Sequence, residues 1–211
     1  MIAVIDYGSG NLRSVAKALE SVGARVEISQ EERVLQQASH LVLPGVGAFA
    51  DCYRNLIESR LLAPIQAHIQ AGRPFLGICV GMQLLFTEGH EFGVHPGLAF
   101  LAGTVREFAK DMVDPEDAER HLKVPHMGWN GVQQSRPHPL WRDIPDGSHF
   151  YFVHSFHASP GDAATVVGQS HYGVPFTAAV AQENLFATQF HPEKSQRHGL
   201  RLLQHFVEWR P

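Results

Sequence analysis

Short apolar runs separated by stretches with helical spacing are the feature that most limits how this chain can fold. Residues 12–19 place apolar side chains at i, i+3, i+4 and i+7, and residues 53–69 show similar spacing. Strands that alternate with helices in this way form parallel sheets that helices cover on both faces. The runs themselves have the length of buried strands and lie at residues 2–5, 26–28, 41–43 and 75–78.

The second half of the chain has a different texture from about Gly97 onward. Short β-rich segments alternate with Gly, Pro, Asn and Asp, which predicts antiparallel or mixed strands. A helix is expected at residues 200–207, and the polar stretch 110–120 is expected to be a solvated loop. We therefore predict one α/β domain over residues 1–211, with a mixed, mainly parallel central sheet flanked by helices and further antiparallel strands in the C-terminal half. The β-rich segments are residues 150–153, 164–167 and 185–188.

The charge pattern argues against nucleic acid and anionic membranes as partners. The formal net charge is -4 and no run of Lys and Arg occurs, so no strong attraction for phosphate is expected. No segment approaches the roughly 20 apolar residues that a membrane-spanning helix needs. The chain has 2 cysteines and begins without a basic, signal-like segment, which favours a cytoplasmic protein with no disulfide framework.

Cys79 is the strongest candidate for a reactive side chain. It lies where an apolar strand ends and helical spacing begins, with Gly77 two residues before it and Gly81 two residues after it. A nucleophile on a sharp strand-to-helix turn needs small neighbours, and the helix N-terminus that follows favours the thiolate. Taken alone, the pentapeptide also fits a small apolar residue packed at a tight turn.

A thiolate that attacks an amide needs an acid for the departing nitrogen. His191 and Glu193 follow a predicted strand at residues 185–190, and residues two apart in an extended segment face the same way. Glu193 is therefore positioned to orient His191, as in the triads of several unrelated folds. The chain contains 14 histidines, so a surface loop in which His and Glu lie close by chance is the alternative.

Backbone amides at two places are candidates to bind the oxyanion formed in acyl transfer. One is the N–H of Val80, the residue after the nucleophile. The other belongs to the turn that contains Val46 and Gly47, directly after the run 41–43, at the edge of the sheet where α/β proteins bind ligands. An ordinary glycine-rich turn is the alternative there.

Other motifs give no support for a metal or a cofactor. The glycines at positions 8 and 10 are not followed by a third, because Arg13 stands there, so the dinucleotide-binding fingerprint fails. His154 and His157 are three residues apart in a β-rich segment, which points them to opposite faces. Cys52 has no comparable turn around it and is expected to serve packing.

Together these motifs resemble the class I glutamine amidotransferases, which have a flavodoxin-like α/β fold. The segments with this resemblance are GICVGMQLLF (residues 77–86) and FHPEKS (residues 190–195). Three other segments, spread over almost the whole chain, resemble one branch, the glutaminase subunits of imidazole glycerol phosphate synthases. They are IDYGSGNLRS (residues 5–14), VPHMGWN (residues 124–130) and YFVHSF (residues 151–156).

The resemblance implies that Cys79 is the nucleophile, that His191 is the general base and acid, and that Glu193 orients it. It implies that Val80 and the Val46–Gly47 segment supply oxyanion donors, with a peptide of that segment reorienting for activity. Val80 replaces the leucine usual after the nucleophile, a change that leaves the backbone N–H intact. The positions implied to bind L-glutamine are Gly47, Gln83, Glu91 and the backbone of His154, Ser155 and Phe156.

The resemblance also implies a partner, because the ammonia must be captured nearby. That partner is a separate cyclase subunit, a (β/α)₈ barrel, with which the chain forms a heterodimer of histidine biosynthesis. The expected contacts are Asn11 in the exposed loop 7–11, Trp129, and Lys194 beside the predicted triad. Alternatives are a glutaminase subunit for anthranilate, guanylate or pyridoxal phosphate synthesis, which the segments 6–14 and 124–130 disfavour, and a non-catalytic regulatory module on the same fold.

Overall fold

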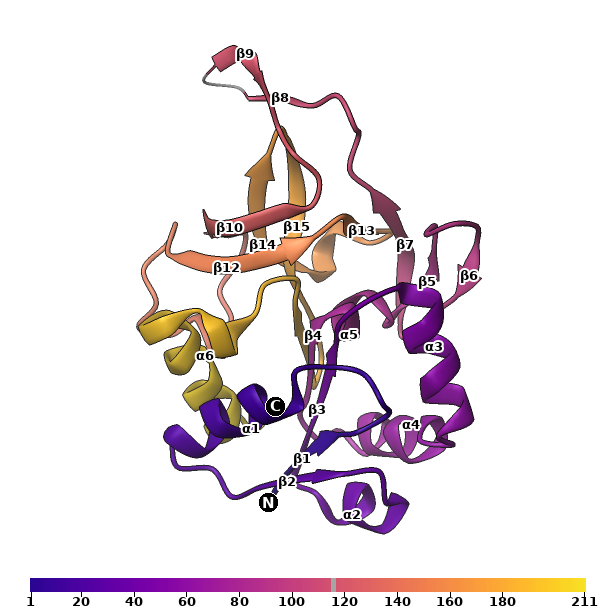
Figure 1. Cartoon of the computed structure of the whole chain (residues 1–211). Coiled ribbons are helices and arrows are strands. Elements are labelled where there is room, and N and C mark those ends of the chain that lie inside the picture. Colours follow the sequence, from indigo (N-terminus) through magenta and orange to yellow (C-terminus); the bar gives the residue numbers. More distant parts are fainter. Residues whose placement is uncertain (115–116) are drawn as a thin grey trace.

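The computed structural model describes residues 1–114 and 117–211. Within these residues an eight-stranded sheet dominates the structure, in the order β11-β14-β15-β16-β4-β3-β1-β2 (Figure 1). Its strands are β1 (Ile2–Ile5), β2 (Val26–Ser29), β3 (His40–Gly45), β4 (Phe75–Cys79), β11 (Gln133–Gln134), β14 (Val166–Tyr172), β15 (Val174–Gln182) and β16 (Leu185–Thr188).

The predicted parallel core of this sheet is confirmed. Strand β1 runs parallel to β2 and β3, and β4 runs parallel to β3 and to β16. Every residue of β1, β3, β4 and β16 is buried, which explains why these segments are apolar without alternation. Strand β16 comes late in the chain but inserts beside β4, so that the residues after it reach the carboxyl end of the parallel strands.

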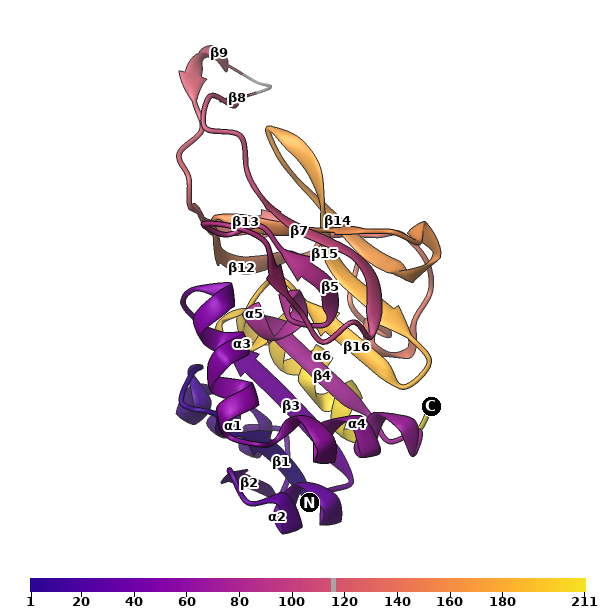
Figure 2. The ribbon, with the colours of Figure 1, turned by 90° about the vertical axis from the view of Figure 1, so that its right-hand side faces the viewer.

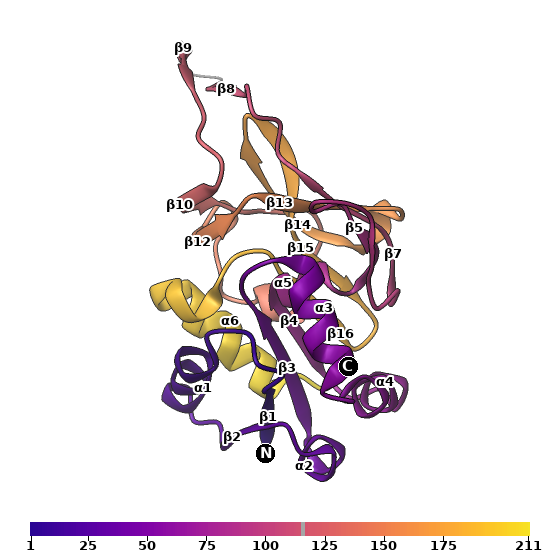
Figure 3. The same cartoon turned by 45° about the vertical axis from the view of Figure 1, so that its right-hand side comes forward.

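Helices cover both faces of the parallel strands, as predicted. Figure 3, which shows these strands nearly edge-on, has α1 and α6 on one side and α2, α3 and α4 on the other. The predicted apolar spacing lies on buried faces, for example Val15 and Leu19 in α1 and Leu203 in α6. The helices are α1 (Leu12–Ser21), α2 (Glu32–Gln37), α3 (Phe49–Glu58), α4 (Leu62–Gln70) and α6 (Gln196–Glu208).

Smaller β structures lie above the carboxyl end of the parallel strands (Figure 2). A four-stranded sheet of the described residues has the order β13-β7-β5-β6, and a two-stranded ribbon joins β10 to β12. In the main sheet β14, β15 and β16 pair antiparallel, whereas β5 and β7 pair parallel, so the second half is mixed. These strands are β5 (Phe86–Gly89), β6 (His95–Pro96), β7 (Leu101–Glu107), β10 (His126–Gly131), β12 (His149–His154) and β13 (Phe156–Pro160).

The helix expected after Cys79 is much shorter than its spacing suggested. Helix α5 spans only Val80–Gln83, and Phe86 already begins β5. Leu84, Leu85 and Phe86 are completely buried, so their apolar character reflects burial on all sides and not one helix face. The amide of Leu98 donates to the carbonyl of Leu84, and the amide of Leu101 at the start of β7 donates to that of Leu85, so the chain leaves the helix here.

Two further expectations about local structure need correction. Residues 163–165 form a 3-10 turn, η2 (Ala163–Thr165), because Asp162 accepts the amide of Ala164 at 2.8 Å; the strand begins only afterward. The polar stretch 110–120 is not simply a loop, because β8 (Val113–Asp114) and β9 (Asp117–His121) form a projecting antiparallel hairpin (Figure 1). Residues 115–116 of that stretch lie outside the described residues.

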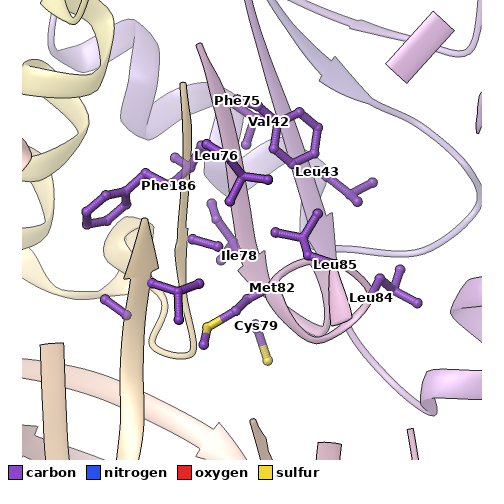
Figure 4. Packing of buried hydrophobic residues seen from close by; sticks show 14 of the residues in the cluster. Val42, Leu43, Phe75, Leu76, Ile78, Cys79, Met82, Leu84, Leu85 and Phe186 are labelled. Carbon is purple, nitrogen blue, oxygen red and sulfur yellow. The ribbon is translucent and has the colours of Figure 1, made fainter. Parts of the chain in front are cut away.

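Among the described residues, no helix is long and apolar enough to cross a membrane. Two other 3-10 turns, η1 (Pro139–Trp141) and η3 (Pro192–Lys194), complete the fold. The hydrophobic core includes apolar side chains from β3, β4 and β16, which pack close to Cys79 (Figure 4). The carboxyl end of β4 is therefore a firmly packed support for whatever side chain stands on it.

Candidate active site

Cys79 stands at the end of β4 in a strained backbone conformation. Its φ is 56° and its ψ is -112°, a combination that costs a non-glycine residue about 1–3 kcal/mol. A Cβ atom on Gly81 would lie 1.9 Å from the carbonyl oxygen of Leu43, and one on Gly77 would lie 2.8 Å from that of Gly81. The sharp turn and the steric need for both glycines agree with the sequence analysis.

The helix that follows Cys79 contributes less to thiolate stability than we expected. A four-residue helix has too few aligned peptides for a large end charge. His191 supplies the stronger influence. Burial alone lowers its pKa, but the Cys79 thiolate and the Glu193 carboxylate outweigh burial and raise the pKa to about 10. The arrangement therefore keeps His191 charged at neutral pH, with its Nε2 atom directed at the sulfur of Cys79.

His191 and Glu193 form the predicted pair, although a turn and not a strand brings them together. His191 Nδ1 lies 2.8 Å from Glu193 Oε1, and the side chains are only 2% and 1% exposed. Strand β16 has already ended at Thr188, and Glu193 belongs to η3. His191 Nε2 has no nitrogen or oxygen partner among the described residues and is directed at the sulfur of Cys79.

The backbone of His191 is held from two directions. Its amide donates to the carbonyl of Tyr151 in β12 at 2.9 Å, and its carbonyl accepts from the hydroxyl of Ser195 at 2.6 Å. The same Ser195 hydroxyl accepts the amide of Tyr151 at 3.0 Å. The imidazole consequently has little freedom to leave the sulfur.

The Val46 segment lies beside the predicted nucleophile, but its peptide does not face it. Gly45 is the sheet partner of Cys79. The amide of Val46 is directed at Ser9 Oγ, 3.4 Å away, and its carbonyl accepts from Ser9 Oγ at 2.7 Å and from Cys52 Sγ at 3.3 Å. Cys52 thus does more than pack. Val80, by contrast, is the first residue of α5, where an amide has no intrahelical partner.

A cavity of about 280 Å³ opens above Cys79. It brings together almost all of the residues predicted to act on glutamine, while Glu193 lies behind His191. Pro125 and Val153 also border the cavity, although neither was predicted as a site residue. The lining residues are Val46, Gly47, Cys79, Val80, Gln83, Glu91, Pro125, Val153, His154, Ser155, Phe156, His191 and Lys194.

Several lining groups are already committed to protein hydrogen bonds. Glu91 Oε2 accepts the amide of Phe49 at 2.6 Å, which fixes the carboxylate at the cavity wall. Gln83 Nε2 donates to the carbonyl of Phe156 at 3.0 Å and to Gln189 Oε1 at 3.1 Å. Both Nε2 hydrogens of Gln83 are thus used, so its side chain can bind a ligand only by accepting a hydrogen bond at Oε1. Gln189 was missed, although a glutamine inside an apolar run is a signal for it.

The three predicted interface residues do not form one group. Lys194 is at the cavity, with Nζ 5.7 Å from the ring centroid of Tyr151, and Trp129 packs 6.1 Å from the same ring. Trp129 is 46% exposed. Asn11 lies apart at the start of α1 and does not line the cavity. The loop 7–11 is not wholly exposed, because Tyr7 is buried and its hydroxyl donates to the carbonyl of Pro44 at 2.8 Å.

The expectation that His154 and His157 point to opposite faces is wrong. The chain turns at Ser155 between β12 and β13, so both imidazoles pack on the ring of Phe108, at centroid distances of 5.3 Å and 4.6 Å. In the described part of the chain, no group of three or more His, Cys, Asp and Glu side chains is arranged to hold a metal ion.

Comparisons with known proteins agree with this site. The family model "Glutamine amidotransferase class-I" matches residues 3–209. The imidazole glycerol phosphate synthase subunit HisH of Syntrophotalea carbinolica is 50% identical over 206 residues, which cover 98% of this chain and 98% of that protein. The corresponding subunit of Dechloromonas aromatica is 53% identical over 212 residues, with 100% and 97% covered. The solved structure of PurLQS from Thermotoga maritima has a TM-score of 0.74 at 18% identity, with 98% and 97% covered, and so shares the fold.

The tight turn at Cys79 predicts that one methyl group added at Gly81 strongly lowers the stability of the protein. Gly81→Ala places its Cβ against the Leu43 carbonyl, and we expect it to lower the free energy of unfolding by about 3 kcal/mol or more. Urea denaturation followed by circular dichroism measures the loss. Gly161→Ala is the matched control, since its nearest neighbour would be 3.4 Å away, and it should change the stability by less than about 0.5 kcal/mol. Equal stability of the two variants would contradict the assigned turn.

The raised pKa of His191 predicts a titration that two variants shift. Because Cys79 and Glu193 both raise this pKa, the imidazolium loses its proton only as the pH rises through about 10. Cys79→Ala and Glu193→Gln should each move that loss to lower pH. Nitrogen NMR of histidine-labelled protein measures the midpoint, with His191→Asn identifying the signal among the 14 histidines. Unchanged midpoints in both variants would show that the three groups are not coupled.

Proposed function

The chain belongs to the class I glutamine amidotransferases, and on that premise we propose that it is the glutaminase subunit of an imidazole glycerol phosphate synthase. It hydrolyses L-glutamine to L-glutamate and ammonia as a single catalytic domain over residues 1–211, and a separate cyclase subunit consumes the ammonia in histidine biosynthesis. The observation that carries the proposal is the strained Cys79 turn facing the buried His191–Glu193 pair across one cavity.

In the proposed reaction the Cys79 thiolate attacks the side-chain amide carbon of glutamine. The carbonyl oxygen gains the negative charge, and in this proposal the Val80 amide donates to it. His191 passes its Nε2 proton to the amide nitrogen, the C–N bond breaks, and ammonia leaves a thioester on Cys79. His191 then takes a proton from water, the resulting hydroxide attacks the thioester, and glutamate departs as the thiolate re-forms. Glu193 stabilises the imidazolium in both halves.

Side chains around the cavity match the ends of a glutamine molecule. Glu91 offers a fixed carboxylate for the substrate's ammonium group. Gln83 offers Oε1 as an acceptor, and Gly47 with the backbone of Ser155 borders the remaining space. Glutamine therefore lies with its amide end at Cys79 and its amino acid end near Glu91.

The oxyanion site is incomplete in the resting arrangement. Val80 is the donor at hand, whereas the Val46 amide is directed at Ser9. We propose that the peptide joining Gly45 to Val46 turns toward the cavity when the enzyme becomes active. The Ser9 hydroxyl opposes that rotation by accepting the Val46 amide, while the bonds from Ser9 and Cys52 to the Val46 carbonyl hold the next peptide in the chain. A partner that moves the loop containing Ser9 would thereby raise activity.

The names of the relatives, and the exposed side chains on β10 near the cavity, support a cyclase subunit as the partner in a heterodimer. Met127 and Trp129 on β10 are 63% and 46% exposed, and Lys194 at the cavity lies over the ring of Tyr151, which Trp129 also contacts. Exposed apolar side chains around a charged group are typical of a protein interface. Asn11 extends the proposed contact toward α1. Ammonia that leaves next to a docked subunit reaches its acceptor before bulk water protonates it. We place this enzyme in the cytoplasm.

The proposed chemistry predicts a separation of two activities. In the complex with the cyclase, Cys79→Ala should lower glutamine-dependent synthesis of imidazole glycerol phosphate at least about a thousandfold, because no thioester can form. Synthesis from added ammonium salt should stay at the wild-type rate. Product formation with each nitrogen source measures both. Glutamate release by Cys79→Ala at the wild-type rate would refute the mechanism.

The proposed restraint on Val46 predicts a gain of function. Ser9→Ala removes the hydroxyl that binds both the amide and the carbonyl of Val46, so the peptide rotates more easily. We expect glutamate release by the isolated chain to rise roughly two- to tenfold and its stimulation by the cyclase to fall correspondingly. Ser59→Ala is the matched control, since Ser59 Oγ also donates to one backbone carbonyl, at 2.8 Å, but at the end of α3. An unchanged basal rate in Ser9→Ala would contradict the restraint.

A further inference from the structure

Two buried histidines next to the cavity have no part in the mechanism above. His126 in β10 and His154 in β12 are cross-strand partners, and their rings meet with Nδ1 of His126 3.0 Å from Nε2 of His154. They are 3% and 6% exposed. Buried polar atoms of this kind normally have a specific role, because leaving them unpaired is costly.

Both rings are neutral at physiological pH. Burial lowers the pKa of His126 to about 4 and that of His154 to about 3. Each imidazole then carries a single ring proton and has one donor and one acceptor nitrogen.

The partners of the two rings fix where those protons lie. The carbonyl of Phe156 can only accept, so His154 Nδ1, which is 2.8 Å from it, carries the proton. His154 Nε2 is then an acceptor, which requires the proton of His126 to be on Nδ1. His126 Nε2 in turn accepts from Asn130 Nδ2 at 3.3 Å, and the second Asn130 donor goes to the carbonyl of His171 at 2.8 Å.

The chain of hydrogen bonds continues from Phe156 to the sulfur. Gln83 Nε2 also donates to the Phe156 carbonyl, so that both lone pairs of this oxygen are used. Gln83 holds Gln189 Oε1, and Gln189 Nε2 lies 3.7 Å from Cys79 Sγ. One ordered set of donors therefore runs from the surface strand β10 to the wall of the cavity and to the nucleophile.

Aromatic packing holds the ring of His126 in the plane that these bonds require. It stacks on Tyr172 at 4.1 Å and on Phe152 at 5.0 Å, with interplanar angles of 27° and 28°. His154 packs against Phe108. The stacking fixes the plane of the ring, and the hydrogen bonds to His154 and Asn130 then select one orientation and one tautomer.

We propose that Asn130, His126 and His154 are positioning residues for glutamine, which act through the Phe156 carbonyl and Gln83 to set the shape of the substrate cavity. This role rests on the proposed function and extends it to the side chains of three residues, of which only His154 borders the cavity. Loss of the His126 bond leaves His154 Nε2 unpaired in the interior, and the ring then gains by turning away from Phe156. Gln83 loses its fixed neighbour as a result.

The test compares two substitutions of His126 in the complex with the cyclase. His126→Phe keeps the stacking on Tyr172 and Phe152 but removes both ring nitrogens. His126→Asn places an amide donor near the former Nδ1 position. We expect His126→Phe to raise KM for glutamine about tenfold with a much smaller change in kcat, and His126→Asn to recover most of the loss.

The control is a buried histidine that is remote from the cavity. His68 in α4 is fully buried, lies 3.0 Å from the carbonyl of Pro74 through Nε2, and has a pKa lowered by burial to about 4. His68→Phe should lower the melting temperature as His126→Phe does, yet leave KM unchanged. If His126→Phe lowers only the melting temperature and leaves KM at the wild-type value, the pair is purely structural and the proposal is overturned.

Two further measurements separate this proposal from the proposed function. Labelling of Cys79 by a diazoketone analogue of glutamine reports binding without turnover, and His126→Phe should raise its half-saturating concentration as it raises KM. A wild-type chain that neither releases glutamate nor becomes labelled refutes the proposed function, and with it a role in positioning glutamine. Nitrogen NMR of the protein without substrate should find the proton on Nδ1 of both His126 and His154. A proton on Nε2 of His154 would overturn the proposed chain of hydrogen bonds, independently of which substrate the enzyme uses.

Discussion

The pairing of β16 with β4 is the contact on which the whole site depends. It places Thr188 beside Ile78, and three residues later the chain sets His191 against Cys79. The parallel core provides the rigidity for this, because β3, β4 and β16 are buried along their full length and large side chains fill the space around them (Figure 4). An imidazolium and a carboxylate so deep in a protein persist only when their geometry is held this firmly.

The strained backbone conformation of Cys79 depends on the close packing around it. The positive φ of Cys79 lifts the sulfur into the cavity, and the Leu43 carbonyl lies so close to Gly81 that no side chain fits there. Packing of the buried strands compensates for the cost of that conformation. The turn therefore needs no long helix after it, and α5 ends after one turn without disturbing the site.

The two walls of the cavity differ in how they are held. On the side of Phe156, neutral histidines and Gln83 form bonds whose directions are all determined. On the side of Val46, the Ser9 hydroxyl holds the amide of Val46, and the same hydroxyl and the Cys52 thiol hold its carbonyl. The first wall suits recognition of glutamine, which requires a fixed shape. The second suits control, because few weak bonds need to break before the peptide rotates.

Sequence alone determined the features that depend on local pattern and on side-chain chemistry. Apolar runs gave β1, β3, β4 and β16, and the glycines around Cys79 gave the turn, because burial and steric crowding leave marks in the residues concerned. Tertiary structure decided which distant groups meet. No local sequence pattern predicts the bonds from Ser9 and Cys52 to Val46, because the fold alone brings these segments together. The same holds for the bonds that run from His126 through His154 to Phe156. The burial of Tyr7 and the early end of α5 also depend on long-range packing. The sequence pattern indicates that these residues are apolar, but it does not indicate which segments they pack against.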